Sequence, residues 1–174
     1  MTFEELTQKS NAELEALMQA GKAPALEALA GHEYQGWNVP FFTRLLGIQK
    51  FIKGFFQGPG GVEGYNIPVR QNGLDDAWTH LPSAQAPKRF GYYLVGPVSA
   101  EAVDHRYPNA LLLDYGASPR NAWYHGERVL RDYLVEPCQC DPELLLGKAY
   151  LALGPRLASN FFILKRLRPT DWRP

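Results

Sequence analysis

The feature that most constrains the fold of this chain is a series of short segments in which apolar residues recur at about every second position. Such alternation is typical of β-strands. Turn signals such as Asn72-Gly73, Gly96-Pro97 and Gly154-Pro155 separate the segments. Consecutive strands joined by short loops pair antiparallel, and closing the sheet removes its exposed edges. The sequence therefore predicts a mainly β fold, an antiparallel barrel of about seven or eight strands, with candidate strands at 32–38, 63–71, 88–96, 110–116, 127–136, 144–153 and 160–168.

Helical patterns precede these strands. Thr2 followed by Glu5 is typical of a capping box, and residues 11–20 place apolar side chains on one face and end before Gly21. A shorter helical stretch covers 24–30. Because no repeat, linker or low-complexity tract interrupts the chain, we expect a single domain, 1–174, with a helical segment at 1–30 and the barrel at 31–168.

A further helix is predicted after the first strand, over 41–56. Its apolar residues form one stripe of period 3.6, while Lys50 and Lys53 lie away from the stripe and are expected in water. The glycines of 57–61 end the helix. We expect it to pack on the barrel and to close one mouth as a lid. An alternative is that its basic face rests on an anionic membrane surface.

The composition excludes several function classes. The 18 basic and 18 acidic residues cancel, so no long-range field attracts nucleic acid. No apolar run approaches the roughly 18 residues of a transmembrane segment, and the acidic N-terminus is unlike a secretory signal, which favours a cytoplasmic location.

The two cysteines, Cys138 and Cys140, are too few for a metal cage and are expected to be free thiols. No hydrolase, metalloenzyme or phosphate-binding motif occurs, so no metal site is expected and no cofactor is identified.

Three stretches of the chain, residues 31–37, 144–154 and 160–167, resemble parts of lipocalin-like (calycin-type) barrels, and the opening is similar also to that of some uncharacterised bacterial barrel domains. Residues 31–37, Gly-His-Glu-Tyr-Gln-Gly-Trp, are similar to the Gly-x-Trp opening of that superfamily, although Gly31 and Trp37 are six positions apart rather than two. Residues 144–154 and 160–167 are similar to its closing strands. The resemblance implies a barrel whose interior holds one small ligand.

We therefore expect the protein to bind a small hydrophobic or amphipathic molecule in a barrel cavity. Aromatic side chains are expected to line it, and charged residues that share strand faces with apolar ones are expected to fix the polar end of the ligand. The expected ligand-binding residues are Trp37, Tyr65, Tyr92, Asp114, Tyr115, Arg131, Lys148 and Tyr150. The alternative is that these mixed faces point to solvent, because a slip of one residue reverses every assignment.

Two other functions stay open at this stage. The barrel cavity could serve an isomerase or cyclase, with an acid and a base drawn from Asp114, Asp76, His80 or a tyrosine. Asp75, Asp76 and His80 could form an acid–base or metal set, although the same residues suit a turn. Asp114 could also meet Arg120 and Asn121 at a barrel rim. The last possibility is a packed barrel that serves as a structural or partner-binding module.

Overall fold

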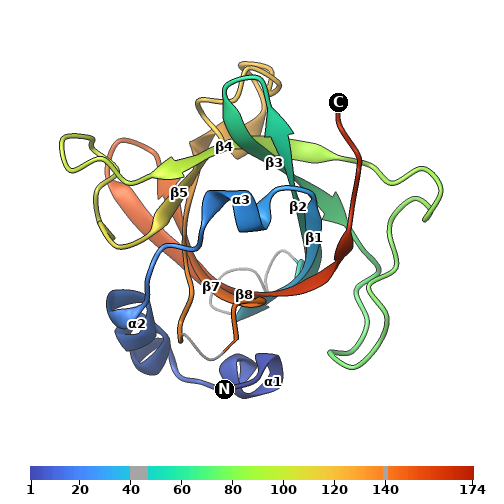
Figure 1. Cartoon of the computed structure of the whole chain (residues 1–174), viewed down its shortest axis with the longest axis horizontal. Helices are drawn as coiled ribbons and strands as arrows, with labels where there is room; N and C mark the ends of the chain where they lie inside the picture. Colours follow the sequence, from blue (N-terminus) through green and yellow to red (C-terminus); the bar gives the residue numbers. More distant parts are fainter. Residues whose placement is uncertain (40–46, 139–140) are drawn as a thin grey trace.

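The computed structural model describes residues 1–39, 47–138 and 141–174. Its eight strands close into an antiparallel barrel in which each strand pairs with the next one along the chain and β8 pairs with β1 (Figure 1). This confirms the mainly β fold and the antiparallel barrel. The strands are β1 (His32–Val39), β2 (Lys50–Gly58), β3 (Gly61–Pro68), β4 (Phe90–Pro97), β5 (Leu111–Asp114), β6 (Leu130–Val135), β7 (Leu144–Ala152) and β8 (Arg156–Pro169), with a 3₁₀ turn, η1 (Gly126–Val129), before β6.

Two N-terminal helices cover the outer face of β7 and β8. Both α1 (Phe3–Thr7) and α2 (Asn11–Ala20) begin with a capping box, that of α1 being the predicted pair of Thr2 and Glu5. Their apolar side chains pack on strand residues such as Leu146 to form an outer apolar layer. The predicted N-terminal helices are therefore confirmed. Among the helices of the described ranges, none is long and apolar enough to cross a membrane.

The third helix, α3 (Leu26–Leu29), closes one end of the barrel. Figure 1 shows α3 across the middle of the ring of strands. Leu29 is buried in the same apolar cluster as the inward-facing residues Tyr34, Phe55 and Leu145. The chain thus blocks this end of the barrel with its own side chains.

A helix was predicted over 41–56, but residues 50–56 form strand β2, so the prediction is wrong there. Residues 41–46 of the predicted helix lie outside the described residues. Both faces of β2 are apolar. Phe55 packs inward on Tyr93, with ring centroids 5.8 Å apart, whereas Phe56 packs on the opposite face against Trp172 at 5.7 Å. Because neither face meets water, the alternation of a half-exposed strand is missing and the apolar positions also fit a helical period.

Lys50 and Lys53 are buried, whereas the helix prediction placed both in water. The Lys50 ammonium donates to the side-chain oxygen of Asn72 at 2.7 Å and to the backbone oxygens of Gly73 and Asp76 at 2.8 Å each. No basic face is therefore available at these two residues for a membrane surface, and β2 is part of the barrel wall rather than a lid.

Lys53 and Asp132 form an ion pair inside the barrel. The Lys53 Nζ lies 3.0 Å from the Asp132 carboxylate and donates to the Tyr115 hydroxyl at 2.5 Å and to the Asn66 amide oxygen at 3.0 Å. Tyr115 in turn donates to Asp132 at 3.0 Å. Burial lowers the pKa of Lys53, and the attraction of Asp132 opposes that shift.

Aromatic rings also lie in the barrel interior. A Cβ added at Gly147 would lie 2.0 Å from the Phe162 ring, and one at Gly64 would lie 2.1 Å from the Tyr93 ring. The missing side chains of these glycines therefore leave the space that two core rings occupy. These rings, the Lys53–Asp132 pair and α3 all occupy space inside the barrel, whereas the pocket described next lies in the barrel wall.

Cys138 lies in the connection between β6 and β7. It is disulfide-bonded, so the prediction of a free thiol is wrong at this residue.

Candidate functional site

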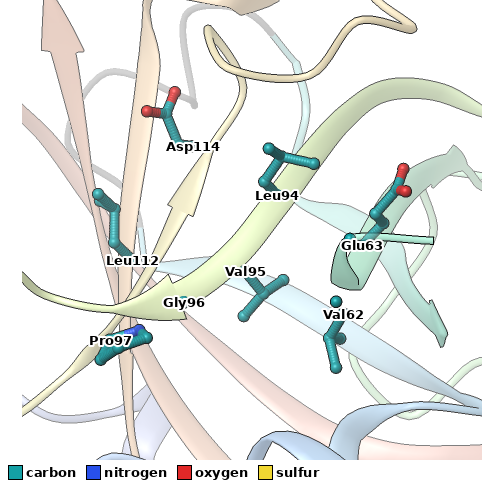
Figure 2. A pocket seen from close by; sticks show the side chains of 10 residues that line it. Val62, Glu63, Leu94, Val95, Gly96, Pro97, Leu112 and Asp114 are labelled. Carbon is teal, nitrogen blue, oxygen red and sulfur yellow. The ribbon is translucent and has the colours of Figure 1, made fainter. Parts of the chain in front are cut away.

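The sheet opens beside the hairpin that joins β2 and β3. Pairing between β3 and β4 begins at Glu63 and Leu94, and beyond that point β4 continues paired with β5, where Gly96 lies opposite Leu112. A pocket of about 290 Å³ occupies this opening (Figure 2). It is lined by Gly60, Gly61, Val62, Glu63, Leu94, Val95, Gly96, Pro97, Leu112 and Asp114.

The inner wall of this pocket, the β3–β4 pocket, belongs to the barrel core. Val62 and Val95 are part of the interior apolar cluster and are 6% and 8% exposed. Gly96 forms part of the wall without a side chain, and a Cβ added there would meet no atom within 4 Å. The pocket thus gives a small molecule direct contact with core side chains.

Two carboxylates stand at the polar side of the β3–β4 pocket. Figure 2 shows the carboxylates of Glu63 and Asp114 pointing away from the two valines. The Arg120 Nε donates to Glu63 at 2.9 Å, and the Arg131 Nη1 lies 3.2 Å from Asp114. Each carboxylate is therefore held in place by one guanidinium, and both keep oxygen atoms that can accept hydrogen bonds.

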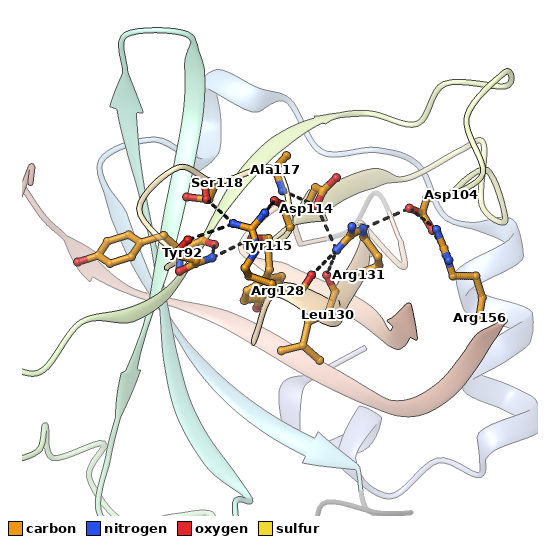
Figure 3. A network of polar contacts seen from close by, with 12 residues as sticks. Tyr92, Asp104, Asp114, Tyr115, Ala117, Ser118, Arg128, Leu130, Arg131 and Arg156 are labelled. Carbon is orange, nitrogen blue, oxygen red and sulfur yellow. Dashed lines mark hydrogen bonds and ion pairs between the residues drawn. The ribbon is translucent and has the colours of Figure 1, made fainter. Parts of the chain in front are cut away.

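An ion-pair network extends from Asp114 to β8 (Figure 3). Arg131 bridges Asp114 and Asp104, with its Nε 3.2 Å from Asp104, and Arg156 also binds Asp104. Burial alone would raise the pKa of Asp104, but the hydrogen bonds and charges of the two arginines outweigh burial and lower it. Asp104 consequently stays ionised and fixes the loop between β4 and β5 to the outer face of the barrel.

The connection between β5 and β6 is held by backbone contacts. The Asn121 amide accepts from the Tyr92 nitrogen at 3.0 Å and donates to the Tyr115 oxygen at 2.8 Å. The Arg128 guanidinium donates to the Gly116 oxygen at 2.6 Å. These contacts fix the segment that carries Arg120, the partner of Glu63 at the pocket.

Asp114 alone among the eight predicted ligand-binding residues lines the β3–β4 pocket, and Arg131 pairs with it. Tyr115 points into the barrel interior, where its hydroxyl bonds Lys53 and Asp132. The other predicted residues belong to outer-face contacts: Trp37 and Tyr150 pack in the layer under α1 and α2, Lys148 lies 3.5 Å above the Phe161 ring, and Tyr65 and Tyr92 pack on Trp172. Their role in ligand binding stays a prediction.

The polar loop residues expected to form one acid–base set have different partners. The His80 ring contacts Arg168 and lies 3.7 Å from Glu33, whereas the Asp76 carboxylate accepts from the Gly73 nitrogen at 2.9 Å. Asp75 lines a separate groove beside α1. Within the described residues, no group of three or more His, Cys, Asp or Glu side chains could hold a metal ion.

His80 is expected to make the stability of the fold depend on pH. Burial, followed by the charge of Arg168, lowers its pKa below 6.5, while Glu33 raises it. A neutral buried histidine stabilises the fold fully above pH 6.5, and this contribution is lost as the pH falls toward the folded-state pKa. The free energy of unfolding should fall by at most about 1.4 kcal/mol per pH unit below 6.5.

Urea denaturation at a series of pH values between 5 and 8 would measure this dependence. His80→Gln should flatten the curve, and His125→Gln, on the 3₁₀ turn side of the barrel, is the matched control. If the free energy of unfolding of His80→Gln depended on pH as steeply as that of the unmodified protein, the pH dependence would belong to a group other than His80.

Comparison of the chain with protein family models, with curated proteins and with solved structures gave no match. The architecture, a closed antiparallel barrel of eight strands, is compatible with the predicted resemblance to lipocalin-like barrels, and none of the comparisons confirms that family.

Sequence reasoning missed most of the β3–β4 pocket. Val62, Val95 and Gly96 belong to no chemical motif, and Gly60 and Gly61 belong to the run 57–61 that was predicted to end a helix. The one feature of the sequence that could have indicated this pocket is the presence of glycine on both sides of it, Gly60 and Gly61 on one side and Gly96 on the other. Glycine in or beside a strand can mark a place where another molecule approaches the backbone closely.

Proposed function

We propose that this protein binds a small amphipathic molecule in the β3–β4 pocket. The observation that carries the proposal is the combination of a wall made by the core residues Val62 and Val95 with a polar side made by Glu63 and Asp114. A volume of about 290 Å³ is at the lower end for ligand pockets, so the ligand is small. The proposed site differs from the central cavity expected from the sequence, because the pocket lies in the wall between β3 and β4.

The polar side selects the kind of head group. Ionised carboxylates accept hydrogen bonds and donate none. The oxygens of Glu63 and Asp114 that remain beside their arginine partners therefore suit an amine or a hydroxyl group. The apolar part of such a ligand would cover Val62, Val95 and Leu112 and remove their exposed surface from water.

Gly96→Leu is the variant that tests this site. A Cβ at Gly96 would meet no atom within 4 Å, and Gly96 lines the pocket, so we expect the leucine side chain to take up pocket space that the ligand would occupy. Octylamine is the probe, and the methyl NMR signals of Val62 and Val95 report its binding. We expect the variant to weaken octylamine binding at least about tenfold, the equivalent of about 1.4 kcal/mol.

Gly126→Leu is the matched control, because a Cβ at Gly126 also meets no atom within 4 Å and this residue lies outside the pocket. It should bind octylamine as the unmodified protein does. Octanoate, with an anionic head group, should bind more weakly than octylamine. Equal affinities of the Gly96→Leu and unmodified proteins, or shifts confined to other residues, would refute the proposed site.

A further inference from the structure

A second pocket lies on the outer face of β6 and β7, under the loop between β4 and β5. Its volume is about 370 Å³. None of its residues lines the β3–β4 pocket, so what it binds is independent of the proposed function. The residues are Val103, His105, Arg106, Tyr133, Tyr150 and Arg156.

The floor of this second pocket is aromatic and rigid. Tyr133 and Tyr150 lie edge to face with ring centroids 5.7 Å apart, and both are almost fully buried. Tyr107 packs on Tyr133 at 5.1 Å, and its hydroxyl donates to Glu15 on α2 at 2.9 Å. The rings are thereby fixed between the strands and α2, so the parts of Tyr133 and Tyr150 that line the pocket give a small molecule a preformed apolar contact.

The wall of the second pocket is cationic. The Arg106 guanidinium lies 5.0 Å from the Tyr150 ring centroid, and within the described residues no carboxylate forms an ion pair with it. Arg156 is bound by Asp104, which Arg131 also contacts, as Figure 3 shows. The Asp104 charge is thus shared by two arginines, and Arg106 keeps its donors for another partner.

His105 adds a polar group to this wall. Its Nδ1 hydrogen-bonds to the Ala102 backbone oxygen. A carbonyl oxygen can only accept, so Nδ1 carries the proton and Nε2 is the nitrogen left for other contacts. The negative groups near the pocket, Asp104 and Glu15, are both bonded to other side chains.

We propose that the second pocket binds a small aromatic carboxylate. The ring of the ligand packs on Tyr133 and Tyr150, and its carboxylate accepts the two parallel hydrogen bonds that a guanidinium such as that of Arg106 can donate. Arg156, fixed by Asp104, also lines the pocket and adds positive charge. An aromatic cation would be repelled by the same groups, and an aliphatic anion would lose the contact with the rings.

Benzoate is the probe for this proposal, and benzamide is its neutral counterpart with the same ring. Titrations followed by the NMR signals of the Tyr133 and Tyr150 rings should show benzoate binding at least about tenfold more tightly than benzamide, as expected for a charge-assisted bidentate contact. This comparison uses the unmodified protein and needs no variant to fold. No binding of benzoate, or equal affinity for both compounds, would overturn the proposal.

The variant Arg106→Gln tests whether Arg106 binds the carboxylate of the ligand. It removes the charge but keeps a side chain of similar shape, and we expect about a tenfold loss of benzoate affinity with little change for benzamide. Arg70→Gln makes the same change at an exposed position outside the pocket and should leave both affinities unchanged. Benzoate affinity that is the same in Arg106→Gln and in the unmodified protein would place the anion elsewhere.

Discussion

Replacing Lys53 by methionine is expected to lower the free energy of unfolding by about 3–5 kcal/mol. The variant leaves Asp132 in the barrel interior, only 4% exposed, without its counter-ion. Tyr115 still donates to the carboxylate, but one neutral hydrogen bond does not replace the ammonium group 3.0 Å away. Urea denaturation followed by circular dichroism measures the loss.

The double variant Lys53→Met with Asp132→Leu separates the cost of an unpaired charge from the loss of packing. Replacing both members of a buried pair by apolar residues is often neutral or stabilising, so the double variant should recover most of the stability. Lys22→Met, at an exposed lysine, is the control and should change stability by less than about 0.5 kcal/mol. If the double variant were as unstable as Lys53→Met, packing rather than charge would explain the loss.

The sequence predicted seven of the eight strands and failed at β2, whose apolar positions also fit a helical period. The Thr2–Glu5 capping box and the apolar face before Gly21 identified the first two helices, and alternation bounded by turn signals identified seven of the strands. In β2 the outer side chains are covered by distant segments, for example Trp172 on Phe56, and Lys50 is bonded by residues 72–76. Hydrophobic periodicity shows only which positions of a segment are apolar. It does not show that residues far away in the chain cover the segment's polar or outer side chains.

The face of each strand was the other point that the sequence could not decide. Leu144, Leu146, Lys148 and Tyr150 do share one face, but this face lies under α1 and α2 rather than inside the barrel. When a strand has an apolar layer on each side, the sequence does not show which set of alternate residues faces the barrel interior. A shift of one residue exchanges the inward and outward sets. The charged pair that does lie inside, Lys53 with Asp132, joins strands β2 and β6, which are far apart in the chain, and no spacing rule connects two such residues.

Phe162→Ala is expected to cost about 3–5 kcal/mol of stability, as other truncations of buried phenylalanines do. The ring is 2% exposed, covers Gly147, packs edge to face on Phe51 at 5.9 Å, and lies 5.2 Å from the Lys53 ammonium. Tyr124→Ala, at a ring that is 70% exposed, removes a similar volume and should cost less than about 1 kcal/mol.

The same truncation tests whether side chains fill the barrel. Because the strands are closed by hydrogen bonds on both edges, they have little freedom to collapse into the space that the ring leaves. We therefore expect Phe162→Ala to contain an apolar cavity that binds benzene, so that benzene raises the melting temperature of this variant and leaves that of the unmodified protein unchanged. Equal stabilisation of both proteins by benzene would show that the interior already has room for a ligand, and the central cavity would then compete with the β3–β4 pocket as the binding site.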